Sequence, residues 1–276
     1  MQPATNSSVL GDFDNTSFTQ HEVTSVFYKQ GDRFFVKTEG ESGELRAFEI
    51  GYAFGFYPLQ QYLIDFPGGR KQALSIAWDS RPGEEGGQKW FHLYPDEKIK
   101  PGDVLHWTKP SQNWNTMCAE CHSMNLQKNY NADNAAFDTT WTDIDVSCES
   151  CHGPGSSHVN WAKQGPGWDS MEKSLGLLLQ LDERKGVFWK TDPTSGKPIR
   201  SEPRVTDKEI EMCARCHSRR SPISEKYAHG ERLMDHYLPR TLDAGMYHND
   251  GQIEDEVYVY GSFRQSKMYQ AGVTCS

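Results

Sequence analysis

The sequence predicts an α+β protein, in which an N-terminal antiparallel β meander is followed by a loop-rich, mostly helical region. The first hundred residues contain short β-branched and aromatic runs separated by glycine-containing turns. Beyond residue 100, apolar residues recur at helical spacing between Gly-, Pro- and Ser-rich stretches. Three Cys-x-x-Cys-His motifs also fall in this second part. We therefore expect a β-rich platform at 1–100 and a second region at 101–276.

The composition limits the class of protein. The chain has 276 residues, enough for one large domain or two modest ones. Only 36% of its residues are hydrophobic, yet it has 8 Trp, 12 Tyr and 13 Phe, whereas a disordered chain is poor in aromatics. A folded protein with a sparse aliphatic core fits this profile, and a bulky apolar cofactor would fill such an interior.

The net charge and the hydropathy exclude two kinds of partner. The formal net charge of -9 disfavours contact with a phosphate backbone, so no nucleic acid is expected. The sequence has no uninterrupted apolar run of 18 residues, so we expect no transmembrane segment in this chain.

The strands of the first region follow one another with tight turns between them. Residues 1–21 are polar and are expected to be irregular. Turn residues at 30–32, 40–43 and 67–69 separate the apolar runs, which favours an antiparallel meander. The expected strands are 23–28, 34–39, 45–52, 62–66, 72–78 and 89–94. This region carries no catalytic motif, and we expect it to serve as a packing or docking platform.

The cysteines carry the main chemical signal. Six of the seven form three Cys-x-x-Cys pairs, and a histidine directly follows each pair. This is the attachment signature of c-type haem, in which both thiols form thioethers and the adjacent histidine binds the iron. The motifs are Cys118/Cys121/His122, Cys148/Cys151/His152 and Cys213/Cys216/His217. The sequence therefore predicts three covalent haem c groups and a second region organised around them.

Three other interpretations of the cysteine pairs are weaker. A four-thiolate zinc site does not require a histidine after each pair, and three pairs would leave one over. A thioredoxin-like redox motif normally occurs once, beside a strand and a helix. A disulfide framework would make the three histidines a coincidence. The seventh cysteine, Cys275, either opens a fourth, truncated haem motif or is a free thiol in a frayed tail.

Helices are expected to carry two of the motifs. Ser111 can cap a helix in which Cys118 and Cys121 share a face. Thr206 and Glu209 form the pattern of a capping box ahead of the third motif. Both motifs are therefore expected near the ends of short helices.

The remaining histidines supply candidate second ligands to iron. His158 follows His152 by six residues across a glycine-rich loop, and it is the preferred candidate, directed at a neighbouring haem. Further candidates in the polar segment after the third motif are His229, His236 and His248. A structural or surface role is expected for His21, His92 and His106.

Other side chains near the motifs leave two alternatives open. Methionine can also ligate haem iron, but at helical spacing it more often fills a core. The methionines concerned are Met117, Met212 and Met268. Arginine can pair with haem propionates or form a solvated basic patch. The arginines concerned are Arg215, Arg219 and Arg220.

Several segments resemble one known family. They are Pro-Leu-Gln-Gln-Tyr at 58–62, Trp-Phe-His-Leu-Tyr-Pro at 90–95, Asn-Trp-Asn at 113–115, the stretch 148–158, and Tyr-Gly-Ser-Phe at 260–263 continuing to 269. Together they resemble multihaem cytochromes with a cytochrome c-552/4 domain, often associated with tetratricopeptide repeats. These are relatives of the tetrahaem acceptor of hydroxylamine oxidoreductase.

The resemblance spans nearly the whole chain and has three implications. His158 is expected to bind another haem, because family members commonly use the last histidine of this element in that way. A signal sequence and a further haem motif are expected before Met1, and a complete haem motif with helical repeats after Cys275. The chain is then an internal fragment of a periplasmic or extracellular protein.

The expected function is electron transfer along bis-histidine haems in a respiratory or nitrogen-cycle pathway, with redox proteins as partners and no catalytic residues. One alternative is a multihaem oxidoreductase that acts on small nitrogen compounds at an open haem. Another is a haem-bearing docking subunit that uses the strand region as its interface.

Overall fold

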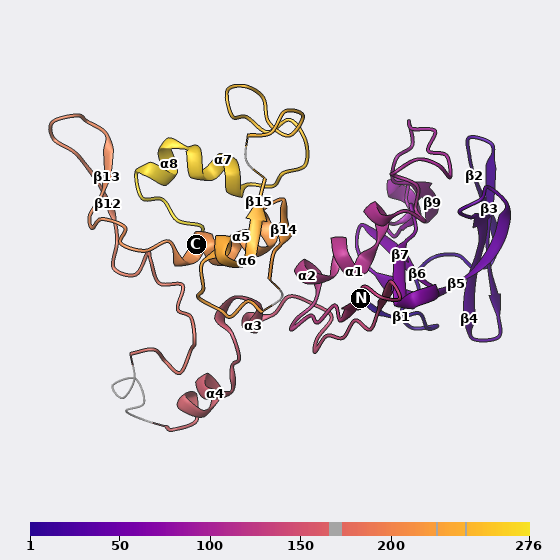
Figure 1. Cartoon of the computed structure of the whole chain (residues 1–276), viewed down its shortest axis with the longest axis horizontal. Coiled ribbons are helices and arrows are strands. Elements are labelled where there is room, and N and C mark those ends of the chain that lie inside the picture. The colour runs from indigo at the N-terminus through magenta and orange to yellow at the C-terminus, as the bar shows by residue number, and fades with distance from the viewer. Residues whose placement is uncertain (166–172, 225, 241) are drawn as a thin grey trace. The chain divides into compact units, whose positions relative to one another are not determined.

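The computed structural model describes residues 1–165, 173–224, 226–240 and 242–276. The chain divides into two compact units, Met1–Asp145 and Val146–Ser276. We call the first the β unit and the second the C-terminal unit, and each is described by itself (Figure 1).

The β unit is built on one antiparallel sheet. Its strands run in the order β2-β3-β4-β5-β6-β8-β9, while β1 pairs with β5 and β7 pairs with β6. The bounds are β1 Gln2–Pro3, β2 Asp14–Gln20, β3 Val23–Gln30, β4 Arg33–Glu39, β5 Leu45–Phe54, β6 Leu59–Phe66, β7 Arg70–Ala73, β8 Ile76–Asp79 and β9 Lys89–His92.

Alternating side chains give this sheet a buried face. In β4, Phe34, Val36 and Thr38 are buried while their neighbours are more exposed, which is the period of two that a half-buried strand requires. Strand β8 is buried along its whole length. Apolar residues on one face of successive strands therefore fold the sheet around a single core.

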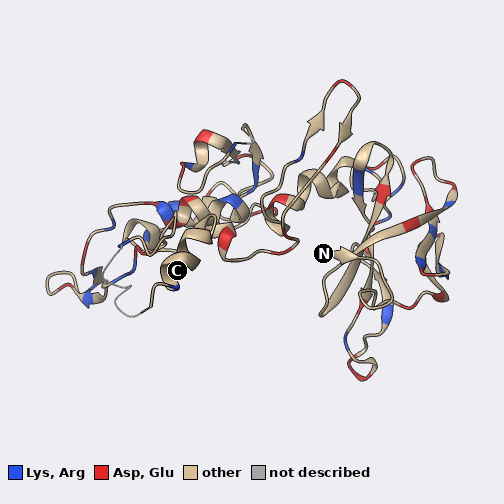
Figure 2. Ribbon diagram, turned by 90° about the horizontal axis from the view of Figure 1, so that it is seen from below, with Lys and Arg blue, Asp and Glu red and all other residues tan. Residues whose placement is uncertain are grey.

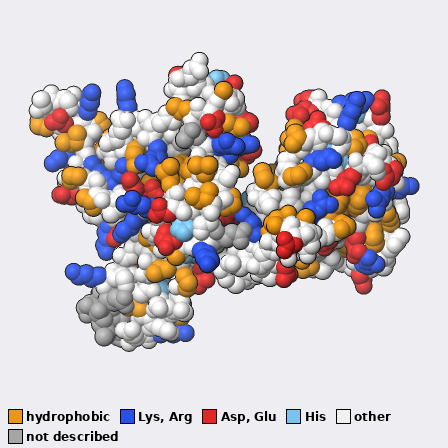
Figure 3. Space-filling model, viewed as in Figure 1, with side chains coloured by type: hydrophobic (Ala, Val, Ile, Leu, Met, Phe, Trp, Pro, Cys, Tyr) orange, Lys and Arg blue, Asp and Glu red, His pale blue; other side chains and the backbone are white. Residues whose placement is uncertain are grey.

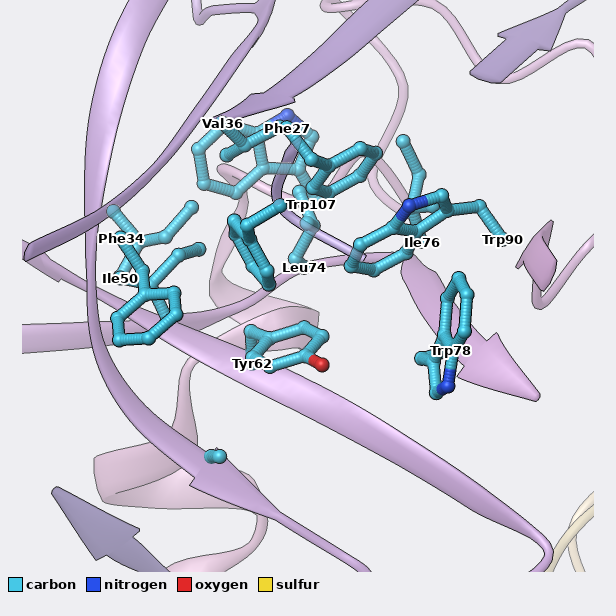
Figure 4. Close-up of a cluster of buried hydrophobic side chains, with 13 residues drawn as sticks. Phe27, Phe34, Val36, Ile50, Tyr62, Leu74, Ile76, Trp78, Trp90 and Trp107 are labelled. Atoms are coloured by element: carbon cyan, nitrogen blue, oxygen red, sulfur yellow. The ribbon is translucent and has the colours of Figure 1, made fainter. Parts of the chain in front are cut away.

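The sheet is nearly closed by an aromatic contact between its ends. The indole Nε1 of Trp90 in β9 lies 3.2 Å from Thr16 Oγ1 in β2 and donates to the Asp12 carbonyl. The ring of Trp90 stacks on Phe27 with centroids 3.6 Å apart, and Phe13 meets both rings edge-on. Figure 4 shows Phe27 and Trp90 in the interior together with Tyr62 and Trp107.

Two expectations about the strands are wrong in detail. The stretch 1–21 is not irregular, because 14–20 forms β2. Its side chains are mostly polar because it pairs on one side only, with β3. The expected strand 72–78 is two strands, with Leu74 and Ser75 between them. The first of these pairs with residues 63–66 and the second with Leu59 and Gln60, so the chain changes partners within one apolar run.

The helices in the described residues are short. The β unit holds α1 Trp114–Met117 and α2 Ala119–His122, and it also has 3-10 turns at Pro67–Gly69, Gly83–Glu85 and Pro110–Gln112. The C-terminal unit holds α3 Cys148–His152, α4 Ser156–Ala162, α5 Lys208–His217, α6 Leu233–His236, α7 Tyr260–Gln265 and α8 Lys267–Gln270. Small two-stranded pairings complete both units: β10 Tyr130–Asn131 with β11 Ala136–Phe137, β12 Trp189–Thr191 with β13 Pro198–Arg200, and β14 Arg220–Pro222 with β15 Tyr237–Pro239.

The predicted fold class is therefore wrong. The protein is mostly β, and the described part of the C-terminal unit is loop-rich rather than helical, since its longest helix, α5, has ten residues. Several helices stop after one turn because the next residue is extended, as at Tyr237 after α6. Glycines with positive φ, such as Gly153 after α3, end others.

The two units differ in their interiors. The β unit has a core of thirteen buried apolar residues, whereas the main cluster of the C-terminal unit has only five: Ile210, Ala214, Leu233, Tyr237 and Tyr260. Most of the exposed large apolar side chains lie in the C-terminal unit, for example Val159, Leu178 and Val205. Hydrophobic side chains are visible on the surface in Figure 3. The C-terminal unit therefore keeps apolar surface that its own core does not cover.

Acidic and basic residues are interspersed along both units (Figure 2). Among the described residues, no helix is both long and apolar enough to cross a membrane.

Candidate functional site

The first Cys-x-x-Cys-His motif lies where two short helices meet. Cys118 ends α1 and begins α2, and it interrupts the single helix that the sequence predicts. The predicted cap at Ser111 is wrong, because Ser111 lies in the 3-10 turn that starts at Pro110 and bonds to Val104 instead. Asn113 caps α1, accepting from the Thr116 amide at 3.1 Å.

A buried asparagine fixes this motif to the sheet. Asn115 is fully buried, and its Oδ1 accepts from the Lys71 amide at 2.8 Å. Its Nδ2 donates to the Gly69 carbonyl at 3.1 Å and to Thr139 Oγ1 at 2.9 Å. The preceding residue, Trp114, packs against Leu63 and Ala73 of the sheet. The anchoring role of Asn115 was not predicted; the only signal for it in the sequence is a polar residue directly after the apolar Trp114.

The reactive groups of the first motif remain near the surface. Cys118 and Cys121 are half-buried, and His122 is exposed. Burial raises the pKa of the Cys118 thiol to about 11, so this thiol is protonated at neutral pH. Cys118 directly precedes α2, and Cys121 and His122 are its last two residues.

The second motif forms α3 and begins at a capping box. The Ser147 side chain accepts from the Ser150 amide, and Ser150 Oγ accepts from the Ser147 amide at 3.3 Å. At the other end, His152 Nδ1 lies 2.8 Å from the Leu179 carbonyl oxygen. A carbonyl can only accept, so Nδ1 carries the proton and Nε2 keeps its lone pair. Histidines that bind metals are commonly oriented in this way.

His158 has the same arrangement one helix further on. It lies in α4, and its Nδ1 is 2.6 Å from the Leu175 carbonyl oxygen. Its ring also stacks on Trp161, with centroids 5.3 Å apart and planes inclined by 22°. The imidazole is therefore held by one bond and one ring contact, and Nε2 is again the atom with a lone pair. Every residue has a backbone carbonyl, so neither orienting contact could be predicted from the sequence.

The third motif occupies the end of α5. The predicted capping box is wrong: the helix begins at Lys208 after Asp207, and Thr206 Oγ1 donates to Glu183 instead. Glu209 is fully buried and accepts from the Ser276 amide at 3.0 Å. In α5, Ile210 and Ala214 are buried on one face and Met212 is buried on another, while Cys213 and Cys216 are half-buried and His217 is exposed.

The second and third motifs lie next to each other in the C-terminal unit. Arg215 Nη1 donates to the Ser150 carbonyl at 3.4 Å, so the two motif helices touch. His229 Nε2 lies 3.2 Å from the same carbonyl. Burial raises the pKa of the Cys151 thiol, and the nearby Cys216 raises it further. The structure thus brings two attachment motifs and one candidate ligand, His229, into a single cluster.

Cys275 also reaches this cluster. Its thiol is hydrogen-bonded to the thiol of Cys213, and this bond raises the pKa of Cys213 and lowers that of Cys275. Cys275 therefore lies beside the third motif, although it follows Cys213 by 62 residues and Cys216 by 59.

The other candidate histidines, His236 and His248, lie next to carboxylates. His236 Nε2 lies 2.7 Å from Glu231 Oε2, and exposed His248 is 3.9 Å from Glu254 through Nδ1. Of the methionines, Met212 is buried beside the third motif, while Met117 and Met268 are exposed.

The three arginines near the third motif make protein contacts. The Arg215 guanidinium lies over the Tyr227 ring at 4.2 Å, and that of Arg220 lies over Tyr237 at 4.1 Å. Arg219 donates to the Glu256 carbonyl at 2.9 Å. These arginines therefore contact aromatic rings and a backbone carbonyl, and they do not form a purely solvated basic patch.

The donor set fits haem better than zinc. Within the described residues, which include all seven cysteines, no group of three or more His, Cys, Asp or Glu side chains is placed to hold a metal ion. Each motif instead presents two partly exposed thiols and one histidine, as thioether attachment requires. Exposed apolar side chains lie beside the motifs as well, including Met117 before Cys118 and Leu178 against Gly153. A large apolar group would cover that surface.

Comparison with known proteins gives one match. The family model described as cytochrome c554 and c-prime matches residues 89–153, a stretch that contains the first two motifs. No curated protein and no solved structure matches the chain. The match supports a c-type cytochrome domain over residues 89–153, and a domain of that kind implies covalently bound haem c.

Proposed function

We propose that the chain transfers electrons along three covalently bound c-type haems, one on each Cys-x-x-Cys-His motif. When bound, c-type haem accepts and releases single electrons at its iron. The observation that carries the proposal is that each motif holds two partly exposed cysteines and a histidine within, or directly before, one helix.

The proposed proximal ligands are His122, His152 and His217. The contact between His152 Nδ1 and the Leu179 carbonyl supports this role, because it leaves Nε2 free to bind iron and fixes the plane of the ring. A fixed ring lets the protein set the strength of the ligand, which is one way in which a haem potential is tuned.

We propose bis-histidine ligation, with His158 as the first candidate for a distal ligand. Its Nδ1 contact with the Leu175 carbonyl supports the same tautomer as in His152. His229 is the second candidate, because it lies against the second motif. His236 and His248 follow, since both are next to carboxylates.

The contact between the second and third motifs supports rapid transfer between their haems. Arg215 of α5 reaches the backbone of α3, and Cys216 is close enough to raise the pKa of Cys151. Short separations between cofactors favour electron transfer. Cys275, hydrogen-bonded to Cys213, is proposed to belong to a fourth attachment site.

Haem attachment of this kind belongs to an export route, so we propose a periplasmic or extracellular location and redox proteins as partners. A respiratory or nitrogen-cycle pathway would use such a carrier.

A reductive titration of the purified holoprotein tests the function. The visible absorption of the reduced form should develop with three electrons per chain. Replacing Cys213 and Cys216 by Ala should reduce this to two. A coloured protein that cannot be reduced and reoxidised would contradict electron transfer.

A further inference from the structure

The β unit contains a second candidate site that the haem motifs do not use. A cavity of about 410 Å³ lies between β3, β4 and the chain at 92–107. This volume is within the range of small-molecule sites, which combine apolar walls with a few polar groups. The apolar wall includes Leu74, Ile76 and Trp107.

One polar group in this cavity lacks a partner. Ser75 is only 5% exposed and lines the cavity. Its Oγ has no hydrogen-bond partner among the residues that the structure describes. A buried hydroxyl without a partner loses its hydration and gains nothing in return, so such groups are rare unless a ligand or ordered water satisfies them.

A second pair of lining groups is spaced for a bridging hydroxyl. The Nδ1 of His106 accepts from the Thr108 amide at 3.4 Å and lies 2.8 Å from Thr108 Oγ1, which places the ring proton on Nε2. That Nε2 is 3.9 Å from Glu39 Oε2, too far for a direct hydrogen bond. A hydroxyl oxygen between them can accept from Nε2 and donate to the carboxylate.

The charges around the cavity favour a neutral ligand. Burial lowers the pKa of His106 and of His92, so both imidazoles are neutral at pH 7. The ammonium of Lys98 is engaged by Glu22 at 2.8 Å. The carboxylates of Glu39 and Glu97 and the ammonium of Lys100 also line the cavity. Neutral imidazoles next to carboxylates suit a hydroxyl better than an anion.

We propose that this cavity binds a small neutral dihydroxybenzene, with one hydroxyl between Glu39 and His106. The second hydroxyl satisfies Ser75, and the ring packs against the apolar wall. The site is separate from electron transfer by the motifs, so either conclusion can fail without the other.

Calorimetric titration of the full-length holoprotein tests this assignment, with resorcinol, phenol and toluene as probes. Resorcinol should bind most tightly, phenol about tenfold more weakly, and toluene weakest. Ser75→Ala should weaken the binding of resorcinol about tenfold, to the affinity of phenol, and should leave the affinity for phenol unchanged. The matched control is Ser17→Ala, at an exposed position in β2.

Thermal melting of the same variants separates binding from folding. Ser75→Ala should melt at or above the temperature of the unsubstituted protein, because it removes an unpaired buried hydroxyl. The proposal is overturned if resorcinol fails to bind, if toluene binds as tightly, or if Ser75→Ala binds resorcinol like Ser17→Ala.

Discussion

The Nδ1 atom of His152 lies 2.8 Å from the carbonyl oxygen of Leu179, 27 residues further along the chain. This long-range contact decides which ring nitrogen can bind iron, because the carbonyl holds the proton on Nδ1. The same arrangement recurs between His158 and Leu175 at 2.6 Å. Two histidines six residues apart are thus held in the same tautomer by carbonyls four residues apart.

The first prediction concerns the ligand role of His158. His158→Met should keep all three haems attached, since no thioether is affected, and should raise one reduction potential. His158→Ala should open one iron and produce a high-spin signal in electron spin resonance. Potentiometric titration and the resonance spectrum of the holoprotein measure these effects.

The control for His158 is His21→Ala, at an exposed histidine in the β unit. It should leave both the potentials and the spin state unchanged. If His158→Ala behaves like the control, His158 is not a ligand, and the assignment passes to His229.

The second prediction concerns the anchor of the first motif. Asn115→Ala leaves the Lys71 amide and the Gly69 carbonyl without their side-chain partner in a buried place. The free energy of unfolding of the β unit should fall by about 3 kcal/mol. Urea unfolding, followed by near-ultraviolet circular dichroism, measures it. The control, Asn134→Ala at an exposed position, should leave the urea midpoint unchanged. If Asn115→Ala has the same urea midpoint as this control, Asn115 does not stabilise the β unit.

The third prediction concerns the pH dependence of stability. Arg81 donates to both carboxylate oxygens of Asp79, at 3.0 and 2.6 Å, and holds the pKa of Asp79 at about 2. A folded-state pKa below the unfolded value of about 3.9 means that the ionised carboxylate stabilises the fold above pH 4. This stabilisation is lost as the pH falls toward 2.

Asp79→Asn should therefore lower the urea midpoint at pH 7, and the difference from the unsubstituted protein should shrink between pH 4 and pH 2. Asp96→Asn, at an exposed position, should show no such convergence. A difference that is constant across this pH range would mean that the effect of Asp79 does not come from its charge.

The strands of the β unit were largely predictable, because local sequence determines them. The runs at 23–28 and 34–39 are rich in β-branched and aromatic residues and lie within β3 and β4. Strand β2 was not predictable in this way, since its residues are polar and its pairing with β3 is a tertiary contact. The division of 72–78 depends likewise on where neighbouring strands end.

The helical content of the C-terminal unit was not predictable from local pattern. The capping signal at Thr206 and Glu209 is overridden because Glu209 is buried against the chain terminus at Ser276. The helix through Cys118 breaks into α1 and α2. Short helices with little core of their own depend on whatever covers their apolar surface, and the sequence pattern does not contain that contribution.

The candidate site was predictable in its residue types and not in its geometry. The Cys-x-x-Cys-His spacing alone predicts the attachment residues. The contact of Cys275 with Cys213 and the approach of His229 to Ser150 depend on the tertiary fold.

The most direct test of the central claim is the mass of the denatured protein after maturation in an oxidising compartment. Three haem masses should remain attached to the chain, and each paired replacement of the cysteines in one motif by Ala should remove one of them. The proposal predicts this stepwise loss at Cys118/Cys121, Cys148/Cys151 and Cys213/Cys216 alike. A chain that carries no covalent haem and retains zinc instead would contradict it.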